Sequence, residues 1–219
     1  MNTKGKNKSV RMESGKDRWY CIGKRCFDLV AALLGSVVLM PLLLLIALLV
    51  KLDSPGPILY RQQRLGKNGV VFTLYKFRSM MADAEPNGPC WAEHNDVRCT
   101  RFGRFLRRTH LDELPQLWNI LRGEMSFVGP RPERAYFYDL LEADIPEFRL
   151  RLRVLPGLTG LAQISGGFAR EPEKKLYWDL RYINERSMGV DLSCLVRTVL
   201  LGARKLMEKG ERLWRPIPF

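Results

Sequence analysis

The chain has 219 residues, the length of one ordinary domain with a real hydrophobic core. Its 36 lysines and arginines outnumber 23 acidic residues, so the net charge of +13 calls for an anionic partner: nucleic acid, an acidic membrane surface or a phosphorylated substrate. Five cysteines without a Cys-x-x-Cys pair and only two histidines argue against a zinc site and favour a reduced protein that faces the cytosol.

The N-terminal part of the chain predicts a membrane segment. Residues 1–18 are mostly polar and basic, and we expect a mobile arm there. Residues 29–50 are apolar or small apart from the interruption at Pro41, and about 20 apolar residues suffice to span a bilayer. A buried core helix is the alternative, but so small a domain has little protein with which to cover it.

Two features of this segment favour a helix that enters the membrane and returns. Pro41 removes a helical hydrogen bond inside the apolar run. Basic residues, which mark the cytoplasmic side of membrane proteins, flank both of its ends: Lys16, Arg18, Lys24, Arg25, Lys51, Arg61, Arg64 and Lys67. We therefore expect residues 19–52 to form a re-entrant membrane helix, with a spanning helix as the alternative.

A hairpin follows the membrane segment. Residues 58–63 and 70–78 read as two strands, joined by the turn Gly66-Lys67-Asn68-Gly69. Lys76 and Arg78 lie on the apolar face of the second strand by alternation, where they can point at a phosphate. A solvated strand end is the alternative. Residues 81–100, which include His94, read as a substrate-side loop.

An acidic pair follows a basic amphipathic turn at residues 103–108. Pro115 has no N–H and fits the first turn of a helix, so we expect a helix to begin close to Asp112. Asp112 and Glu113 would then lie at the positive end of the helix dipole, where ionised acids are favoured. An acidic first turn on an ordinary amphipathic helix is the alternative.

Arginines on both sides of the pair favour a site for phosphate and Mg²⁺. Arg107 precedes the acids, and Arg131 follows them in the rigid run Gly129-Pro130-Arg131-Pro132, called the corner below. Carboxylates beside cations suit both a magnesium ion and a phosphate. We expect the dipole and Arg107 to lower the pKa of Asp112, which would keep Asp112 ionised, as a nucleophile must be, and make it a poor base.

The C-terminal third is expected to be mainly helical. The predicted elements are a helix at 133–152, a turn at 155–160, a short extended piece at 161–164, a helix from Pro172 and an amphipathic helix at 191–209. Gln163 and Asp179 are candidates for contact with substrate. For Asp179 an ion pair on the helix surface is the alternative.

The motifs quoted so far resemble those of a known family. Leu111-Asp112-Glu113-Leu114-Pro115-Gln116-Leu117-Trp118-Asn119 and the corner, supported by residues 75–80 and 156–160, resemble the bacterial sugar transferases, the monotopic phosphoglycosyl transferases. The likeness runs from about Lys24 to the last helix. Two departures are Met40 in place of a serine before Pro41, and Ser165-Gly166-Gly167 in place of a polar run such as Asn-Gly-Arg.

The resemblance implies a fold class and a location. The fold would be α+β and mainly helical, with a re-entrant membrane helix and a compact cytosolic catalytic domain at residues 53–219. A small β-hairpin and amphipathic interfacial helices would belong to that domain. The protein would lie at the cytoplasmic face of the bacterial inner membrane, in contact with membrane lipids.

The resemblance also implies a reaction. A UDP-hexose type of nucleotide sugar would lose its sugar phosphate to Asp112 with release of UMP, and polyprenyl (undecaprenyl) phosphate would then accept it. Glu113 would hold Mg²⁺, and the candidate phosphate clamps are Lys76, Arg78, Arg107 and Arg131. Oligomeric state stays open, with a homo-oligomer among the alternatives.

Three alternatives to this reading remain. A membrane-tethered nucleic-acid binder would suit the charge, but the sequence shows no nucleic-acid-binding module, so we expect no nucleic-acid partner. A non-catalytic scaffold would leave the acidic pair without a purpose. Within the enzyme reading, the lipid phosphate can attack directly, with Asp112 as its base.

Overall fold

The computed structural model describes residues 15–81, 84, 88, 90, 96–166 and 171–213. Residues 1–14 of the predicted arm and His94 lie outside this part of the chain. Residues 15–18, which were also expected in the arm, belong to the first helix, so that boundary is wrong. The described helices are α1 (Gly15–Val38), α2 (Met40–Asp53), α3 (Arg101–Thr109), α4 (Gln116–Arg122), α5 (Ala135–Glu142), α6 (Leu161–Ile164), α7 (Pro172–Glu185) and α8 (Met188–Leu213), with 3-10 turns at Lys67–Gly69, Leu111–Glu113 and Pro146–Arg153. The strands are β1 (Leu59–Leu65), β2 (Val71–Phe77), β3 (Ser126–Val128) and β4 (Gly157–Thr159). The predicted mainly helical class is confirmed.

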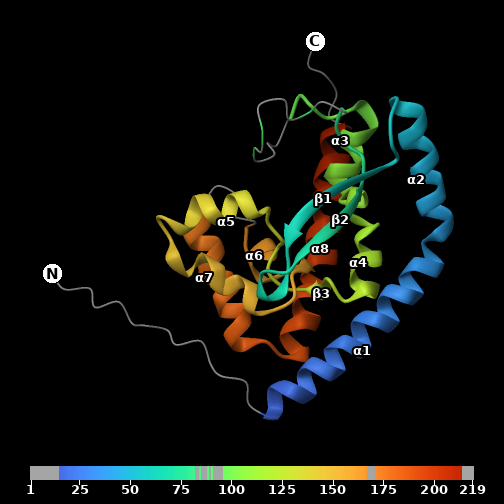
Figure 1. Cartoon of the computed structure of the whole chain (residues 1–219). Coiled ribbons are helices and arrows are strands. Elements are labelled where there is room, and N and C mark those ends of the chain that lie inside the picture. The colour runs from blue at the N-terminus through green and yellow to red at the C-terminus, as the bar shows by residue number, and fades with distance from the viewer. Residues whose placement is uncertain are drawn as a thin grey trace.

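Helices α1 and α2 form a bent pair along one edge of the molecule (Figure 1). The bend is 63° and falls at Leu39, just before Pro41 in the first turn of α2. Neither helix alone is long and apolar enough to cross a membrane, whereas the pair together passes that test. Both helices leave large apolar side chains exposed, among them Leu33, Leu34, Val37, Val38, Leu44, Leu45, Leu48 and Leu52. The predicted break at Pro41 is confirmed.

The first half of α1 is joined to the rest of the fold by polar contacts. Arg25 donates two hydrogen bonds to carbonyls at the end of α4, at 2.6 and 2.9 Å. Lys24 forms an ion pair of 2.8 Å with Asp191 of α8. The buried carboxylate of Asp28 accepts a bond from the backbone N–H of Phe127 in β3. The helix pair is therefore attached to the elements that lead into the corner.

The predicted hairpin is confirmed. Strands β1 and β2 pair antiparallel from Leu65 opposite Val71 to Leu59 opposite Phe77. The turn needs left-handed backbone at Asn68 (φ 58°) and Gly69 (φ 78°), which asparagine and glycine tolerate best. Phe72 and Leu74 on the inner face pack in a core cluster with residues of α1 and α4, which fixes β2 beside the acidic pair.

A second, parallel pair of strands was not predicted. Residues 155–160 read as a turn, but β4 lies within them and pairs with β3, Ser126 opposite Gly157 and Val128 opposite Thr159. A side chain at Gly157 would come within 2.1 Å of the backbone nitrogen of Gly129, so only glycine permits this approach. The pairing presses the β4 segment against the corner.

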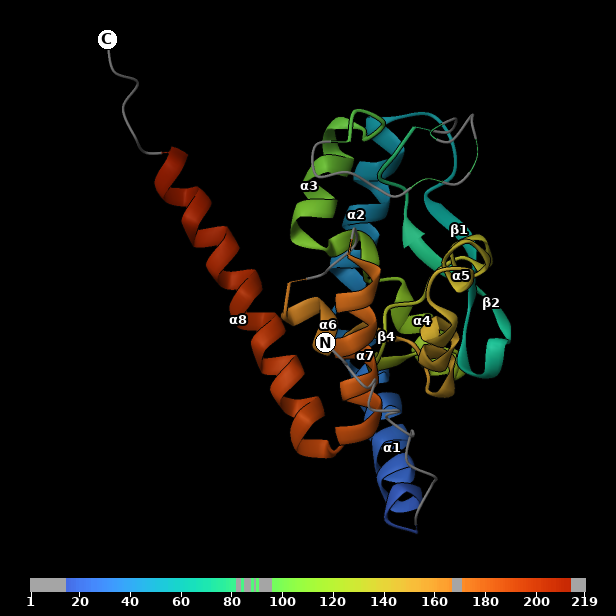
Figure 2. The same cartoon turned by 90° about the vertical axis from the view of Figure 1, so that its left-hand side faces the viewer.

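Two predicted elements were wrong. The helix expected at 133–152 is divided, because α5 ends at Glu142 and a 3-10 turn begins at Pro146; a proline disfavours helical backbone in the residue before it, and Ile145 has φ −135°. Residues 161–164 form the helix α6 rather than an extended piece, since short apolar runs suit either state. The predicted helices at 172 and at 191–209 are confirmed as α7 and α8. Figure 2 shows α8 leaving the body of the fold towards its C-terminal end.

Candidate active site

The acidic pair lies between two helices. Helix α3 ends at Thr109, and His110 takes a left-handed conformation (φ 58°) that turns the chain. Asp112 and Glu113 occupy the following 3-10 turn, and α4 begins only at Gln116. The prediction that the pair lies in the first turn of that helix is therefore wrong by a few residues. The dipole effect falls off within the first turn, so other groups must set the charge of the pair.

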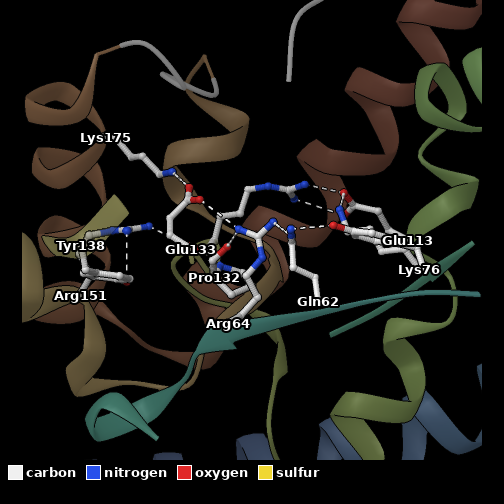
Figure 3. A network of polar contacts seen from close by, with 11 residues as sticks. Gln62, Arg64, Lys76, Glu113, Pro132, Glu133, Tyr138, Arg151 and Lys175 are labelled. Carbon is white, nitrogen blue, oxygen red and sulfur yellow. Dashed lines mark hydrogen bonds and ion pairs between the residues drawn. The ribbon is translucent and has the colours of Figure 1, made fainter. Parts of the chain in front are cut away.

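Glu113 is held by two cations. Lys76 of β2 donates to its Oε1 at 3.0 Å, and Arg131 of the corner contacts both oxygens, at 2.5 and 3.2 Å. Figure 3 shows the side chains of Lys76 and Glu113 side by side. Burial alone would raise the pKa of Glu113, but the charges of Arg131 and Lys76 outweigh burial and hold that pKa well below its ordinary value. Glu113 is thus an ionised carboxylate.

Asp112 is equally buried but differently placed. The residue is 6% exposed, and its side chain has no hydrogen bond or ion pair within the described ranges. Burial, followed by the charge of Glu113, raises the pKa of Asp112 to about 6, although Lys76, Arg131 and Arg107 oppose the rise. The expected lowering of this pKa is therefore wrong. The physical reason is that Lys76 and Arg131 make their ion pairs with Glu113, so their attraction for Asp112 does not outweigh burial.

Three of the predicted phosphate clamps surround the acidic pair. The charges of Lys76, Arg107 and Arg131 all act on Asp112. Arg107 belongs to the last turn of α3. The side chain of Arg131 is 38% exposed, against 9% for that of its partner Glu113. Arg131 therefore keeps donors open to an incoming anion, and arginine can bind a phosphate through two parallel bonds.

Arg78 has other partners. Its buried guanidinium donates to the carbonyls of Val50, Ser54 and Pro55, at 3.3, 2.6 and 2.6 Å. It therefore satisfies carbonyls at the end of α2 that no helical N–H can reach. The two cations that strand alternation placed on one face thus have different partners, and the phosphate contact of Arg78 stays a prediction.

Gln163 and Asp179 also make no hydrogen bond or ion pair with Asp112 or Glu113 in the described part of the chain. The amide oxygen and nitrogen of Gln163 are buried, and neither has a hydrogen-bond partner in the described part of the chain. A side chain at Gly160 would meet that amide oxygen at 2.7 Å and the carbonyl of Gly129 at 2.2 Å, so Gln163 lies against the corner. Asp179 is 1% exposed and accepts a bond of 2.6 Å from Arg151, so its predicted contact with substrate has no support in these contacts.

A buried ionic network was missed from the sequence. Its described members are Arg64, Glu133, Arg151, Lys175 and Asp179, and Figure 3 shows Arg64, Glu133, Arg151 and Lys175 around Pro132 of the corner. In the sequence Arg151 stands between two other arginines, Arg149 and Arg153. No local pattern distinguishes the buried arginine, because its partners come from distant elements.

The described residues contain no group of three or more His, Cys, Asp and Glu side chains that could hold a metal ion. The acidic pair offers two adjacent carboxylates. A carboxylate has about four lone-pair positions, and Glu113 uses three of them in its bonds to Lys76 and Arg131. Glu113 keeps one position and Asp112 keeps its own oxygens. Mg²⁺ usually takes one or two protein carboxylates and completes its shell with phosphates and water, so the pair fits this ion.

Comparison with known proteins connects this geometry to a family. The model of the bacterial sugar transferases matches residues 19–205. The chain is 40% identical over 189 residues to the UDP-N-acetylgalactosamine-undecaprenyl-phosphate N-acetylgalactosaminephosphotransferase of Aeromonas hydrophila. It is 45% identical over 181 residues to the UDP-glucose:undecaprenyl-phosphate glucose-1-phosphate transferase of Caulobacter vibrioides, and 44% identical over 186 residues to the exopolysaccharide production protein PSS of Rhizobium leguminosarum.

The matched regions differ in how much of each relative they cover. They include 84%, 80% and 81% of this chain, but 45% of the Aeromonas protein, 68% of the Caulobacter protein and 93% of the Rhizobium protein. The match to the family model includes the helix pair, the acidic pair, the corner and most of α8. The chain therefore belongs to the bacterial sugar transferase family.

Proposed function

We propose that this protein transfers a sugar 1-phosphate from a UDP-sugar to undecaprenyl phosphate, releases UMP, and so starts the assembly of a membrane glycan or exopolysaccharide. The observation that carries the proposal is the acidic pair with Lys76, Arg107 and Arg131 around it. Phosphoryl transfer needs an in-line nucleophile and cations for the spreading negative charge, and these residues supply both. The names of the relatives describe the same reaction.

The two carboxylates suit different tasks. Glu113 anchors Arg131 and Lys76, so it sets the direction in which the guanidinium meets the diphosphate of the donor. Asp112 has no described partner and is free to attack. An oxygen of Asp112 forms a bond to the sugar-bearing phosphorus, the bond from that phosphorus to the bridging oxygen breaks, and UMP leaves. An oxygen of the lipid phosphate then attacks the same phosphorus and displaces Asp112.

The pKa of Asp112 bears on both mechanisms that the sequence left open. A pKa of about 6 leaves Asp112 mostly ionised at neutral pH, as nucleophilic attack requires. It also makes Asp112 a stronger base than an ordinary aspartate, so its pKa does not exclude the base mechanism. The covalent route is proposed because the oxygens of Asp112 have no described partner that would compete with phosphorus.

We also propose that Mg²⁺ takes part, with Glu113 as its ligand and Asp112 beside it. When bound, the ion supplies positive charge to the phosphate oxygens of the donor. Lys76 and Arg131 then act as the fixed cations of the site. Release of UMP that does not change when Mg²⁺ is removed with EDTA would contradict this part.

The bent helix pair is proposed to be a re-entrant membrane anchor at the cytoplasmic face of the bacterial inner membrane. Exposed leucines and valines on both helices and basic residues at both ends support this. Helix α8 adds an exposed apolar stripe formed by Leu192, Val196, Val199 and Leu200, which suits a helix that lies in the membrane interface. Such an anchor would bring a lipid phosphate to a site that a soluble UDP-sugar can also reach.

Two experiments test the proposed function. Purified protein is incubated with a panel of UDP-sugars, with and without undecaprenyl phosphate, while UMP and lipid-linked product are followed. We expect one donor to give both products in wild-type protein and neither in Glu113→Gln. In intact cells, a thiol reagent that cannot cross membranes should miss single cysteines placed before Lys24 and after Lys51 alike. Labelling of only one end would mean a spanning segment.

A further inference from the structure

The backbone of the corner is held by two arginines, the buried Arg151 and the half-buried Arg64. The carbonyl of Arg131 accepts a hydrogen bond of 2.8 Å from Arg151, and the carbonyl of Pro132 accepts one of 3.2 Å from Arg64. Figure 3 shows Arg64 beside Pro132 and Glu133. Arg131, whose side chain contacts Glu113, is therefore also held through its backbone carbonyl.

Arg151 is itself locked in place. Its side chain is fully buried, donates from Nε to Asp179 at 2.6 Å and from Nη1 to the hydroxyl of Tyr138 at 3.3 Å, and lies 4.6 Å from the ring centre of Phe148. Asp179 comes from α7 and Tyr138 from α5. A buried ion pair is weak evidence for a stabilising role, because desolvation offsets most of its attraction. Its geometry points instead to a role in placing the backbone carbonyl of Arg131, which Arg151 reaches from Nη2 at 2.8 Å.

We propose that Arg151 is a positioning residue that sets the place of Arg131, with Asp179 as the counter-ion that orients Arg151. The proposal rests on the proposed function and deepens it, because it assigns a role to two residues that do not touch substrate. Arg131 binds Glu113 through two bonds, and a two-pronged contact depends on angle as well as distance. Asp179 acts through Arg151 and Arg131 rather than by contact with the nucleotide sugar.

The neighbouring anchor makes this testable. Arg64 bonds to the carbonyl of Pro132 and pairs with Glu133, which in turn pairs with Lys175. We therefore expect loss of the bond from Arg151 to displace Arg131 while the corner stays folded. Arg149 offers a matched control on the same 3-10 turn. Its side chain is 41% exposed and pairs only with Asp139 and Glu142 in the described part of the chain.

The test compares Arg151→Lys with Arg149→Lys in the full-length protein in detergent micelles. A second variant, Arg151→Met with Asp179→Leu, removes both buried charges and the bond to the carbonyl while filling the same space with apolar groups, so that folding is retained. The structural readout is the ¹⁵N Nε–Hε signal of Arg131, assigned by its loss in Arg131→Lys. We expect it to shift or broaden in both variants of Arg151 and to stay unchanged in Arg149→Lys. An unchanged signal in the Arg151 variants would overturn the proposal.

The kinetic readout is a double-mutant cycle. A misplacement of the order of 1 Å in a positioned group can lower rates by up to about a hundredfold. We expect Arg151→Lys to lower kcat/KM about tenfold at a temperature where both proteins are folded. In the Arg131→Lys background the same change should cost less than about twofold, because its route through Arg131 is already lost. Equal losses in both backgrounds would mean a general structural role and would overturn the proposal. If neither wild-type protein nor any variant converts a UDP-sugar, the proposed function fails. The positioning role of Arg151 is then tested by the ¹⁵N Nε–Hε signal of Arg131 alone.

Discussion

Two groups of arginine–carboxylate pairs lie on the two sides of the corner, and they differ mainly in contact with solvent. In the first, Arg131 is 38% exposed and pairs with Glu113, while Asp112 beside them has no described partner. In the second, Arg151 and Asp179 are 0% and 1% exposed and satisfy one another. Arginine–carboxylate pairs therefore have two different roles in this protein. An open pair beside a free carboxylate can meet a substrate, and a closed pair can only hold the protein around it.

The two aspartates should respond to substitution in opposite ways, and the largest effect is expected at Asp112. Asp112→Asn keeps the size of the side chain but removes the attacking charge, so turnover should fall about a thousandfold or more. Because burial beside Glu113 already disfavours the ionised form, the melting temperature should be unchanged or higher. Turnover assays and thermal unfolding measure the two effects. A melting temperature of Asp112→Asn clearly below that of wild type would mean that Asp112, like Asp179, mainly stabilises the fold.

Asp179→Asn should show the reverse pattern. It leaves the buried guanidinium of Arg151 without its counter-ion, and breaking a buried pair in this way lowers the free energy of unfolding by about 3–5 kcal/mol. Chemical unfolding in detergent measures the loss, and Asp139→Asn, in an exposed pair with Arg149, is the control with an expected change below about 1 kcal/mol. Equal losses of unfolding free energy in the two variants would mean that the buried pair and the exposed pair contribute alike to stability.

The second group also predicts a pH effect. Burial alone would raise the pKa of Glu133, but the charges of Lys175, Arg64 and Arg151 outweigh burial and lower it to about 2, from an ordinary value of 4.5. The unfolded chain therefore binds this proton first, so the stabilisation is complete above about pH 4.5 and is lost as the pH falls towards 2. The difference in unfolding free energy between wild type and Glu133→Gln should shrink by about 2–3 kcal/mol over that range. A difference that stays constant with pH would contradict the assignment.

The smallest effect is expected at the open arginine. Arg131→Lys keeps the charge but replaces a planar fork with a point charge, so kcat/KM should fall about ten- to a hundredfold while stability changes little. Arg149→Lys, in an exposed pair, should keep wild-type rates. A wild-type kcat/KM in Arg131→Lys would show that Arg131 is not a phosphate clamp.

The sequence predicted the solvent-exposed group around Arg131 and Glu113 better than the buried group around Arg151 and Asp179, for a physical reason. Pro41 and the Gly66–Gly69 turn act on their own neighbours in the chain, so the bend and the hairpin could be predicted. The hairpin then brings Lys76 to the acidic pair. The closed group depends on Arg151 meeting Asp179 from another helix, and β4 exists only because β3 pairs with it. Long-range partners of this kind leave no periodic signal.

The charge of Asp112 could not be predicted for a related reason. The sequence shows cations near Asp112, but it does not show that Lys76 and Arg131 make their bonds with Glu113. It also shows neither the burial of Asp112 nor the separation of the pair from the first turn of α4. Competition between two adjacent carboxylates for the same cations is decided by geometry alone.

The most direct test of the account is whether Asp112 becomes covalently modified when no lipid acceptor is present. Wild-type protein with Mg²⁺ and its UDP-sugar donor is analysed by intact mass and by UMP release, with Asp112→Asn as the control. We expect about one UMP per active site, a mass increase of one sugar phosphate, and an adduct that peptide mapping places on Asp112. Folded wild-type protein that forms no adduct and releases UMP only after undecaprenyl phosphate is added would contradict it, and Asp112 would then act as a base.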